Sequence, residues 1–182
     1  MITWIVLLVI FFLVMSTEYY AWRTGVPTVA SFRKVRGVML DVLKRHHAEY
    51  KGSELYTIID LGSGHGQLAT LIARALPDAK VTGIEISFVA WFISYARRLL
   101  GGPANLQFKC VDFWPYDISK LDAVIIFLTS NLIERMAKKL RAELKPGALI
   151  ISNECPLENG WEPIEILETG VFKVKVYVYK QA

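Results

Sequence analysis

A run of alternating glycines between an apolar strand and an apolar helix constrains this sequence more than any other feature. Residues 56–61 are predicted to form a buried strand, and residues 68–76 a helix. Between them, Gly62, Gly64 and Gly66 recur at every second position. Glycine has no Cβ and tolerates positive φ, so the backbone of this loop can approach a ligand closely. This order of elements predicts an α/β fold with a nucleotide-type ligand bound where the strand ends.

The rest of the chain continues to alternate between strands and helices. Further strands are expected over 80–85, 106–111, 123–128 and 148–152, with helices over 34–47, 88–100 and 132–144. This alternation implies parallel pairing through right-handed crossovers. The last two β-rich runs, 164–168 and 171–179, are joined by Thr169 and Gly170, which predicts a hairpin. We therefore expect a Rossmann-like, doubly wound seven-strand sheet with a C-terminal antiparallel hairpin.

The residues around the glycine loop discriminate between possible ligands. The dinucleotide fingerprint needs a glycine or alanine three positions after its second glycine, and Gln67 occupies that position. Asp60, directly before the loop, would repel a pyrophosphate but attract the ammonium and sulfonium of S-adenosylmethionine. Glu85 ends the second strand, where a carboxylate can accept hydrogen bonds from both ribose hydroxyls. These residues favour S-adenosylmethionine as the cofactor.

The third strand supplies candidates for the adenine end of the cofactor. Asp112 could meet the adenine amino group while the ring of Phe113 lies against the base. Alternatively, Asp112 only caps the turn that follows it. The predicted cofactor-binding residues are Asp60, Gly62, Ser63, Gly64, Gly66, Glu85, Ile86, Asp112 and Phe113.

An uncharged run at residues 2–17 precedes this domain. Its apolar part is ~25 Å long as a helix at ~1.5 Å per residue, close to a ~30 Å hydrocarbon layer. It lacks the positive start and small-residue end of a secretory signal. We therefore expect residues 1–22 to form one transmembrane helix, with Tyr19, Tyr20 and Trp22 at the interface. The alternative is that these aromatic side chains pack against the domain.

Basic residues dominate residues 23–50, which we interpret as a juxtamembrane segment and lead-in helix ahead of a cofactor-binding domain at 51–182. By the positive-inside rule, the domain is expected on the cytoplasmic side of a single-pass membrane protein. Anionic lipid headgroups account for the basic segment, so no nucleic acid partner is expected. The absence of an arginine-rich presequence favours a prokaryotic inner membrane over an organelle. The oligomeric state stays open.

Two sequence motifs indicate a family. The motif Asp60-Leu61-Gly62-Ser63-Gly64-His65-Gly66, with Gly83-Ile84-Glu85-Ile86-Ser87 downstream, resembles class I, seven-strand methyltransferases over roughly residues 35–180. The resemblance implies a seven-strand sheet and S-adenosylmethionine.

A narrower resemblance is to the membrane-anchored lysine methyltransferases that modify the ATP synthase c subunit and the adenine nucleotide translocase, and to their prokaryotic relatives. It rests on the apolar anchor, Val26-Pro27-Thr28, Trp91, Tyr95 and Val111-Asp112-Phe113-Trp114. It implies a lysine in a membrane protein as the acceptor. His65 departs from the pattern, because the family usually has an acidic residue there.

Candidates for the acceptor site follow the fourth and fifth strands, because ligands lie beyond the carboxyl ends of strands in such sheets. Asn131 could orient an amine, and Glu154, next to Asn153, could accept its proton. The substrate channel is predicted to include Thr28, Thr129, Ser130 and Trp161. The alternatives are helix capping by Ser130 or Asn131, solvation of Glu154 and structural packing of Trp161.

Three alternatives compete with lysine methylation. An anchored domain with an aromatic channel would also meet a lipid, a quinone or another apolar small-molecule acceptor. A membrane-tethered assembly factor could retain the fold without turnover. Nucleic acid is disfavoured, because residues 129–132 lack the proline and aromatic tetrad of such amino-methylating enzymes. No metal is expected, since His46 and His47 are adjacent on a helix and point ~100° apart.

Overall fold

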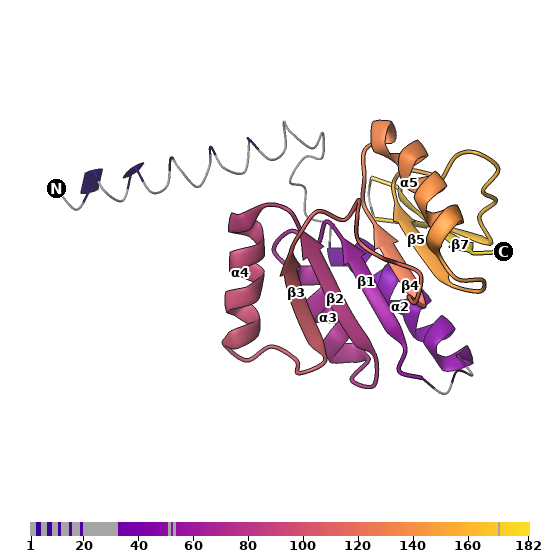
Figure 1. Ribbon diagram of the computed structural model, residues 1–182, viewed down its shortest axis with the longest axis horizontal. Coiled ribbons are helices and arrows are strands. Elements are labelled where there is room, and N and C mark those ends of the chain that lie inside the picture. The colour runs from indigo at the N-terminus through magenta and orange to yellow at the C-terminus, as the bar shows by residue number, and fades with distance from the viewer. Residues whose placement is uncertain are drawn as a thin grey trace.

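The computed structural model describes residues 33–50, 52, 54–170 and 172–182, together with Thr3, Trp4, Leu7, Leu8, Phe11, Met15 and Tyr19 near the amino terminus. One seven-stranded sheet with helices on both faces forms the domain (Figure 1). Its helices are α2 (Arg33–Glu49), α3 (Gln67–Ala75), α4 (Phe88–Leu99) and α5 (Ser130–Glu143). Its strands are β1 (Thr57–Leu61), β2 (Lys80–Glu85), β3 (Leu106–Cys110), β4 (Ala123–Ile126), β5 (Leu149–Asn153), β6 (Glu165–Thr169) and β7 (Val174–Lys180).

The strand order is β3-β2-β1-β4-β5-β7-β6. Strands β1 to β5 pair in parallel, while β7 runs antiparallel to both β5 and β6. The predicted Rossmann-like seven-strand sheet with its C-terminal antiparallel hairpin is therefore confirmed. The switch of direction matters for the site, because β7 begins at the sheet edge where the parallel strands end.

Two apolar layers hold the helices to the sheet. One layer joins α2 and α3 to one face through Met39, Leu43 and Ile72, all fully buried. The other joins α5 to the opposite face, with Met136 and Leu140 packed against the strands. Burial of such side chains from water is the main stabilising contribution. The strands themselves are therefore rigid supports for the loops at their ends.

Some element boundaries differ from the sequence prediction. β4 stops at Ile126, and α5 already begins at Ser130, which follows Thr129 in extended conformation. β7 begins only at Val174, because Lys173 before it has a φ of 51° and belongs to the turn. These shifts lengthen the loops at the carboxyl edge, where the site is expected.

The predicted membrane anchor at residues 1–22 lies mostly outside the described residues, as does Thr28 of the predicted channel. Within the described part of the chain, no helix combines the length and apolar composition that crossing a membrane requires. The anchor and the domain boundaries at 22 and 50 stay predictions.

Candidate functional site

One edge of the sheet gathers most of the predicted site residues. Strands β1 to β5 all end there, and β7 starts there. The glycine loop leaves this edge from β1, Glu85 from β2, and the turn with Asp112 from β3. Thr129, Ser130 and Asn131 follow β4, and Glu154 follows β5. The edge thus has a cofactor half over β1–β3 and a second half over β4, β5 and β7.

The glycine loop is fixed by its own backbone. The amides of Gly62 and Ser63 both donate to the Ile84 carbonyl, at 2.9 and 2.8 Å. Gly62 and Gly64 have φ values of 78° and 53°, and a Cβ built on either would meet nothing within 4 Å. A Cβ on Gly66 would instead collide with the Phe108 ring. The first two glycines therefore leave open space for a ligand, whereas the third permits packing.

Glu85 is oriented by backbone donors from both sides. Its Oε2 accepts a hydrogen bond from the Gly64 amide at 2.9 Å, and its Oε1 accepts one from the Ser87 amide at 2.8 Å. Each carboxylate oxygen keeps a further lone pair. The side chain is thus held in place to accept bonds from two neighbouring hydroxyls, as the ribose role requires.

Asp60 is buried, with 7% of its surface exposed. Burial raises its pKa to about 7, the charge of Glu85 adds to the increase, and the Ala69 amide opposes it. Without a ligand, the carboxyl is therefore half protonated near neutral pH. A cationic group placed beside it would favour the charged carboxylate.

Three buried polar atoms near this loop have no hydrogen-bond partner within the described part of the protein. They are Ser63 Oγ, Ser87 Oγ and Trp91 Nε1. Buried polar groups are normally paired, so these atoms suit a polar ligand or water. With the open space over Gly62 and Gly64 and the oriented Glu85, they fit S-adenosylmethionine. Ser87 was missed by sequence reasoning, although its place between a predicted strand and helix was a usable signal.

The predicted adenine contacts lie beside this region. Asp112 is exposed, and its Oδ1 accepts the Trp114 amide at 3.0 Å, as the turn-capping alternative supposed. Phe113 is buried in the core on the α5 face, with its ring centroid 4.9 Å from that of Trp114. Ile86 is half-buried between Glu85 and Ser87. The roles of all three toward adenine stay predictions.

The second half of the edge has weaker internal bonding. Ser130 and Asn131 are exposed in the first turn of α5, where Thr129 is the N-cap residue. Asn153, only 1% exposed, ends β5, and its Oδ1 has no hydrogen-bond partner among the described residues. Glu154 follows in an exposed position with a φ of 64°.

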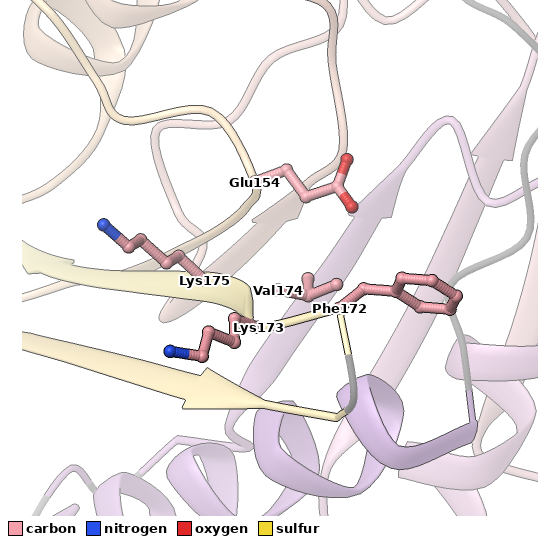
Figure 2. A pocket seen from close by; sticks show the side chains of 5 residues that line it. All are labelled: Glu154, Phe172, Lys173, Val174 and Lys175. Atoms are coloured by element: carbon pink, nitrogen blue, oxygen red, sulfur yellow. The ribbon is translucent and has the colours of Figure 1, made fainter.

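Glu154 also lines an open pocket of about 520 Å³, together with Phe172, Lys173, Val174 and Lys175 (Figure 2). Sequence reasoning missed Phe172, since nothing in its local sequence distinguishes it.

Trp161 packs against α5 and β7. Its Nε1 donates to the Ala137 carbonyl at 3.3 Å, and its ring centroid lies 6.0 Å from that of Tyr179. The Arg141 guanidinium lies 4.9 Å from the indole centroid. This is the structural packing that was the alternative to a channel role.

The two adjacent histidines make separate contacts. His46 Nδ1 lies 2.7 Å from the Tyr56 hydroxyl, and His47 Nε2 lies 3.5 Å from Asp78 Oδ2. Among the residues the structure describes, no three histidine, cysteine or acidic side chains gather as a metal site would require.

Comparison with known sequences identifies related proteins. The family model for the ANTKMT methyltransferase domain matches residues 60–165. A protein-lysine N-methyltransferase of Saccharolobus islandicus is 30% identical over 165 residues, which cover 85% of this chain and 92% of that protein. The adenine nucleotide translocase lysine N-methyltransferase of Mus musculus is 29% identical, over 85% of this chain and 64% of its own length. The lysine N-methyltransferase of Xenopus laevis that is named for the ATP synthase c subunit is also 29% identical, over 66% and 52%.

Solved structures share the fold. An RNA methyltransferase from Salinibacter ruber, in complex with S-adenosyl-L-homocysteine, matches with a TM-score of 0.71 over 84% of this chain and 93% of that one, at 22% identity. A plantazolicin methyltransferase in complex with S-adenosylhomocysteine matches with a TM-score of 0.52 over 65% and 46%, at 23% identity. At these identities, the likeness concerns the arrangement of the sheet and helices.

Proposed function

The chain belongs to the ANTKMT methyltransferase family, and we propose that it methylates a lysine side chain of a membrane protein. It is an S-adenosylmethionine-dependent methyltransferase. The observation that carries the acceptor proposal is the match to a protein-lysine N-methyltransferase along 92% of that protein. A membrane protein as substrate is supported by the names of the two vertebrate relatives.

The cofactor half of the edge holds and orients the methyl donor in this proposal. Bound S-adenosylmethionine supplies a methyl group activated by a positively charged sulfur. Glu85 binds the ribose hydroxyls, Asp60 faces the cationic amino-acid end, and the backbone of Gly62 and Gly64 allows close approach. Asp112 and Phe113 border the adenine. Most of the catalysis comes from holding the two reactants in line and excluding water.

The second half of the edge handles the acceptor. A lysine ammonium must lose a proton before its nitrogen can attack, and a poorly solvated site favours the neutral amine. The nitrogen then forms a bond to the methyl carbon, while the carbon–sulfur bond breaks and its electron pair moves to sulfur. Asn131 orients the amine and Glu154 takes up a released proton. Thr28, Thr129 and Ser130 line the approach.

The test is methyl transfer to a membrane extract. Purified protein in detergent is incubated with S-adenosylmethionine carrying a labelled methyl group and with membranes from cells lacking this protein. Protein and lipid are then separated, and the protein fraction is hydrolysed. We expect the label in N-methylated lysine, and none with Glu85→Ala as the control. Label in the lipid fraction alone would contradict the proposal and support an apolar small-molecule acceptor.

We also propose that residues 1–22 anchor the protein in a prokaryotic inner membrane as a single-pass segment, with the catalytic domain on the cytoplasmic side. The uncharged run 2–17 and the basic residues after it support this arrangement. Replacing Leu8 and Phe11 by lysine should move the protein from the membrane pellet to the supernatant after carbonate washing. Full-length protein that already remains in the supernatant would overturn the anchor.

A further inference from the structure

The pocket of Figure 2 lies where β5 ends and β7 begins. Its two sides come from separate parts of the chain, Glu154 on one and residues 172–175 on the other. The antiparallel register pairs Asn153 with Val176, and the Glu154 amide donates to the Lys175 carbonyl at 2.8 Å. Pairing of β7 with β5 therefore assembles the pocket at the same edge as the cofactor half.

An unsatisfied polar group links this pocket to the cofactor half. The registers align Asp60 with Ile125, and Ile125 with Ile151, across β1, β4 and β5. Side chains alternate between faces along a strand, so Asn153 lies on the same face as Ile151 and Asp60. In the strand order, its buried Oδ1, which has no partner among the described residues, falls between Asp60 and the start of β7. A polar group that reaches the edge there would satisfy it.

The pocket combines an acid with an apolar wall. Figure 2 shows the Glu154 carboxylate on the same side as the Phe172 ring, while the Lys173 and Lys175 ammonium groups extend the other way. Phe172 is 79% exposed, and Val174 is buried at the base of the turn. Such a site suits a flexible apolar chain ending in a cation. The side chain of lysine has this form.

Glu154 is held in its position at a conformational cost. Its φ of 64° lies in the left-handed region, which is unfavourable for a residue with a Cβ. The amide bonds from Glu154 to Lys175 and from Cys155 to Asn153, both 2.8 Å, fix the turn. Strain of this kind is common where a side chain serves a ligand.

We propose that this pocket receives the acceptor lysine, an inference that rests on the proposed function. Phe172 and Val174 pack against the methylene groups of the lysine. Glu154 pairs with the ammonium as it enters, and Asn153 Oδ1 accepts a hydrogen bond from the nitrogen. Phe172 is therefore an acceptor-binding residue with no part in cofactor binding.

The test compares two pocket variants, Phe172→Ala and Glu154→Gln, with exposed controls elsewhere. Phe92→Ala, on α4 with 55% of its phenylalanine exposed, matches the first, and Glu158→Gln matches the second. The detergent-solubilised membrane extract serves as acceptor, and its half-saturating concentration is measured. We expect this concentration to rise about tenfold or more for Phe172→Ala, as loss of one aromatic contact predicts. Phe172→Leu should restore most of the affinity.

Cofactor binding separates the possible outcomes. Calorimetry with S-adenosylhomocysteine should give the same affinity, within about twofold, for wild type and both pocket variants, since folding and the cofactor half are intact. Wild-type protein that labels no lysine would overturn the proposed function. Wild-type protein that labels lysine, with pocket variants behaving like the controls, would overturn the pocket assignment alone.

Discussion

The two halves of the carboxyl edge are built in different ways. In the cofactor half, Gly62, Gly64, Glu85 and Ser87 are tied together by backbone hydrogen bonds within a stretch of the chain that is short in sequence. In the acceptor half, Glu154 and Phe172 come from segments that meet only through the pairing of β5 with β7. One half is organised before its ligand arrives, while the other leaves a buried amide oxygen unsatisfied among the described residues.

This difference matches the demands on each half. A small cofactor gains affinity from groups that are already oriented, since fewer degrees of freedom are lost on binding. An acceptor lysine arrives on another protein and must enter and leave, so an open, partly exposed pocket suits it. Changes in the two halves should therefore affect different steps.

The largest expected effect is on the carboxylate of the cofactor half. Glu85→Ala removes the acceptor for two backbone amides and for the ribose hydroxyls. We expect the affinity for S-adenosylhomocysteine to fall by about 100-fold or more, because hydrogen bonds to charged groups are each worth about 1.5–3 kcal/mol. Calorimetry measures this loss. Equal losses for Glu85→Ala and Glu154→Gln would show that the halves are not separate.

A Cβ in the glycine loop should have the next largest effect. Gly62→Ala forces a side chain into positive φ and into the space left for the cofactor. We expect the affinity for S-adenosylhomocysteine to fall roughly 10- to 100-fold, about 1–2 kcal/mol coming from backbone strain alone. Gly37→Ala in α2 is the matched control, since its Cβ also meets nothing within 4 Å but lies in a helix. An unchanged affinity for Gly62→Ala would refute the loop's close approach to the ligand.

The buried acid predicts a pH dependence limited to the cofactor half. The pKa of Asp60 is raised to about 7, so a cationic ligand must displace a proton below that pH. The affinity for S-adenosylmethionine should fall about tenfold between pH 8 and pH 6, following the protonated fraction. Asp60→Asn should bind more weakly at pH 8 and lose this dependence. A pH profile that survives in Asp60→Asn would assign the titration to another group.

The same acid predicts a smaller effect on stability without ligand. A carboxyl with a raised folded-state pKa binds its proton more tightly in the folded protein. Its contribution to stability is therefore full at low pH, decreases as pH rises from about 4 to about 7, and stays low above that. Asp60→Asn should raise the melting temperature at pH 8 but not at pH 4. A lower melting temperature at pH 8 would mean that the charged form is stabilised.

The contrast also explains what the sequence could predict. The strand order of the parallel part and the cofactor half follow from local signals, because Asp60, the glycines and Glu85 each stand at the end of a recognisable strand. Asn153 and Glu154 could be named for the same reason. Phe172 could not, because its partner Glu154 is set by the register of β7 on β5 rather than by neighbouring residues. The packing of Gly66 against Phe108 likewise depends on β3 and was not visible locally.

A crystal structure with S-adenosylhomocysteine and a lysine-containing acceptor peptide would test the division of the edge most directly. We predict the ribose on Glu85, the amino-acid end over Gly62 and Gly64, and the lysine side chain between Glu154 and Phe172. A cofactor bound over β4 and β5, or a lysine that approaches from the β3 side, would contradict it.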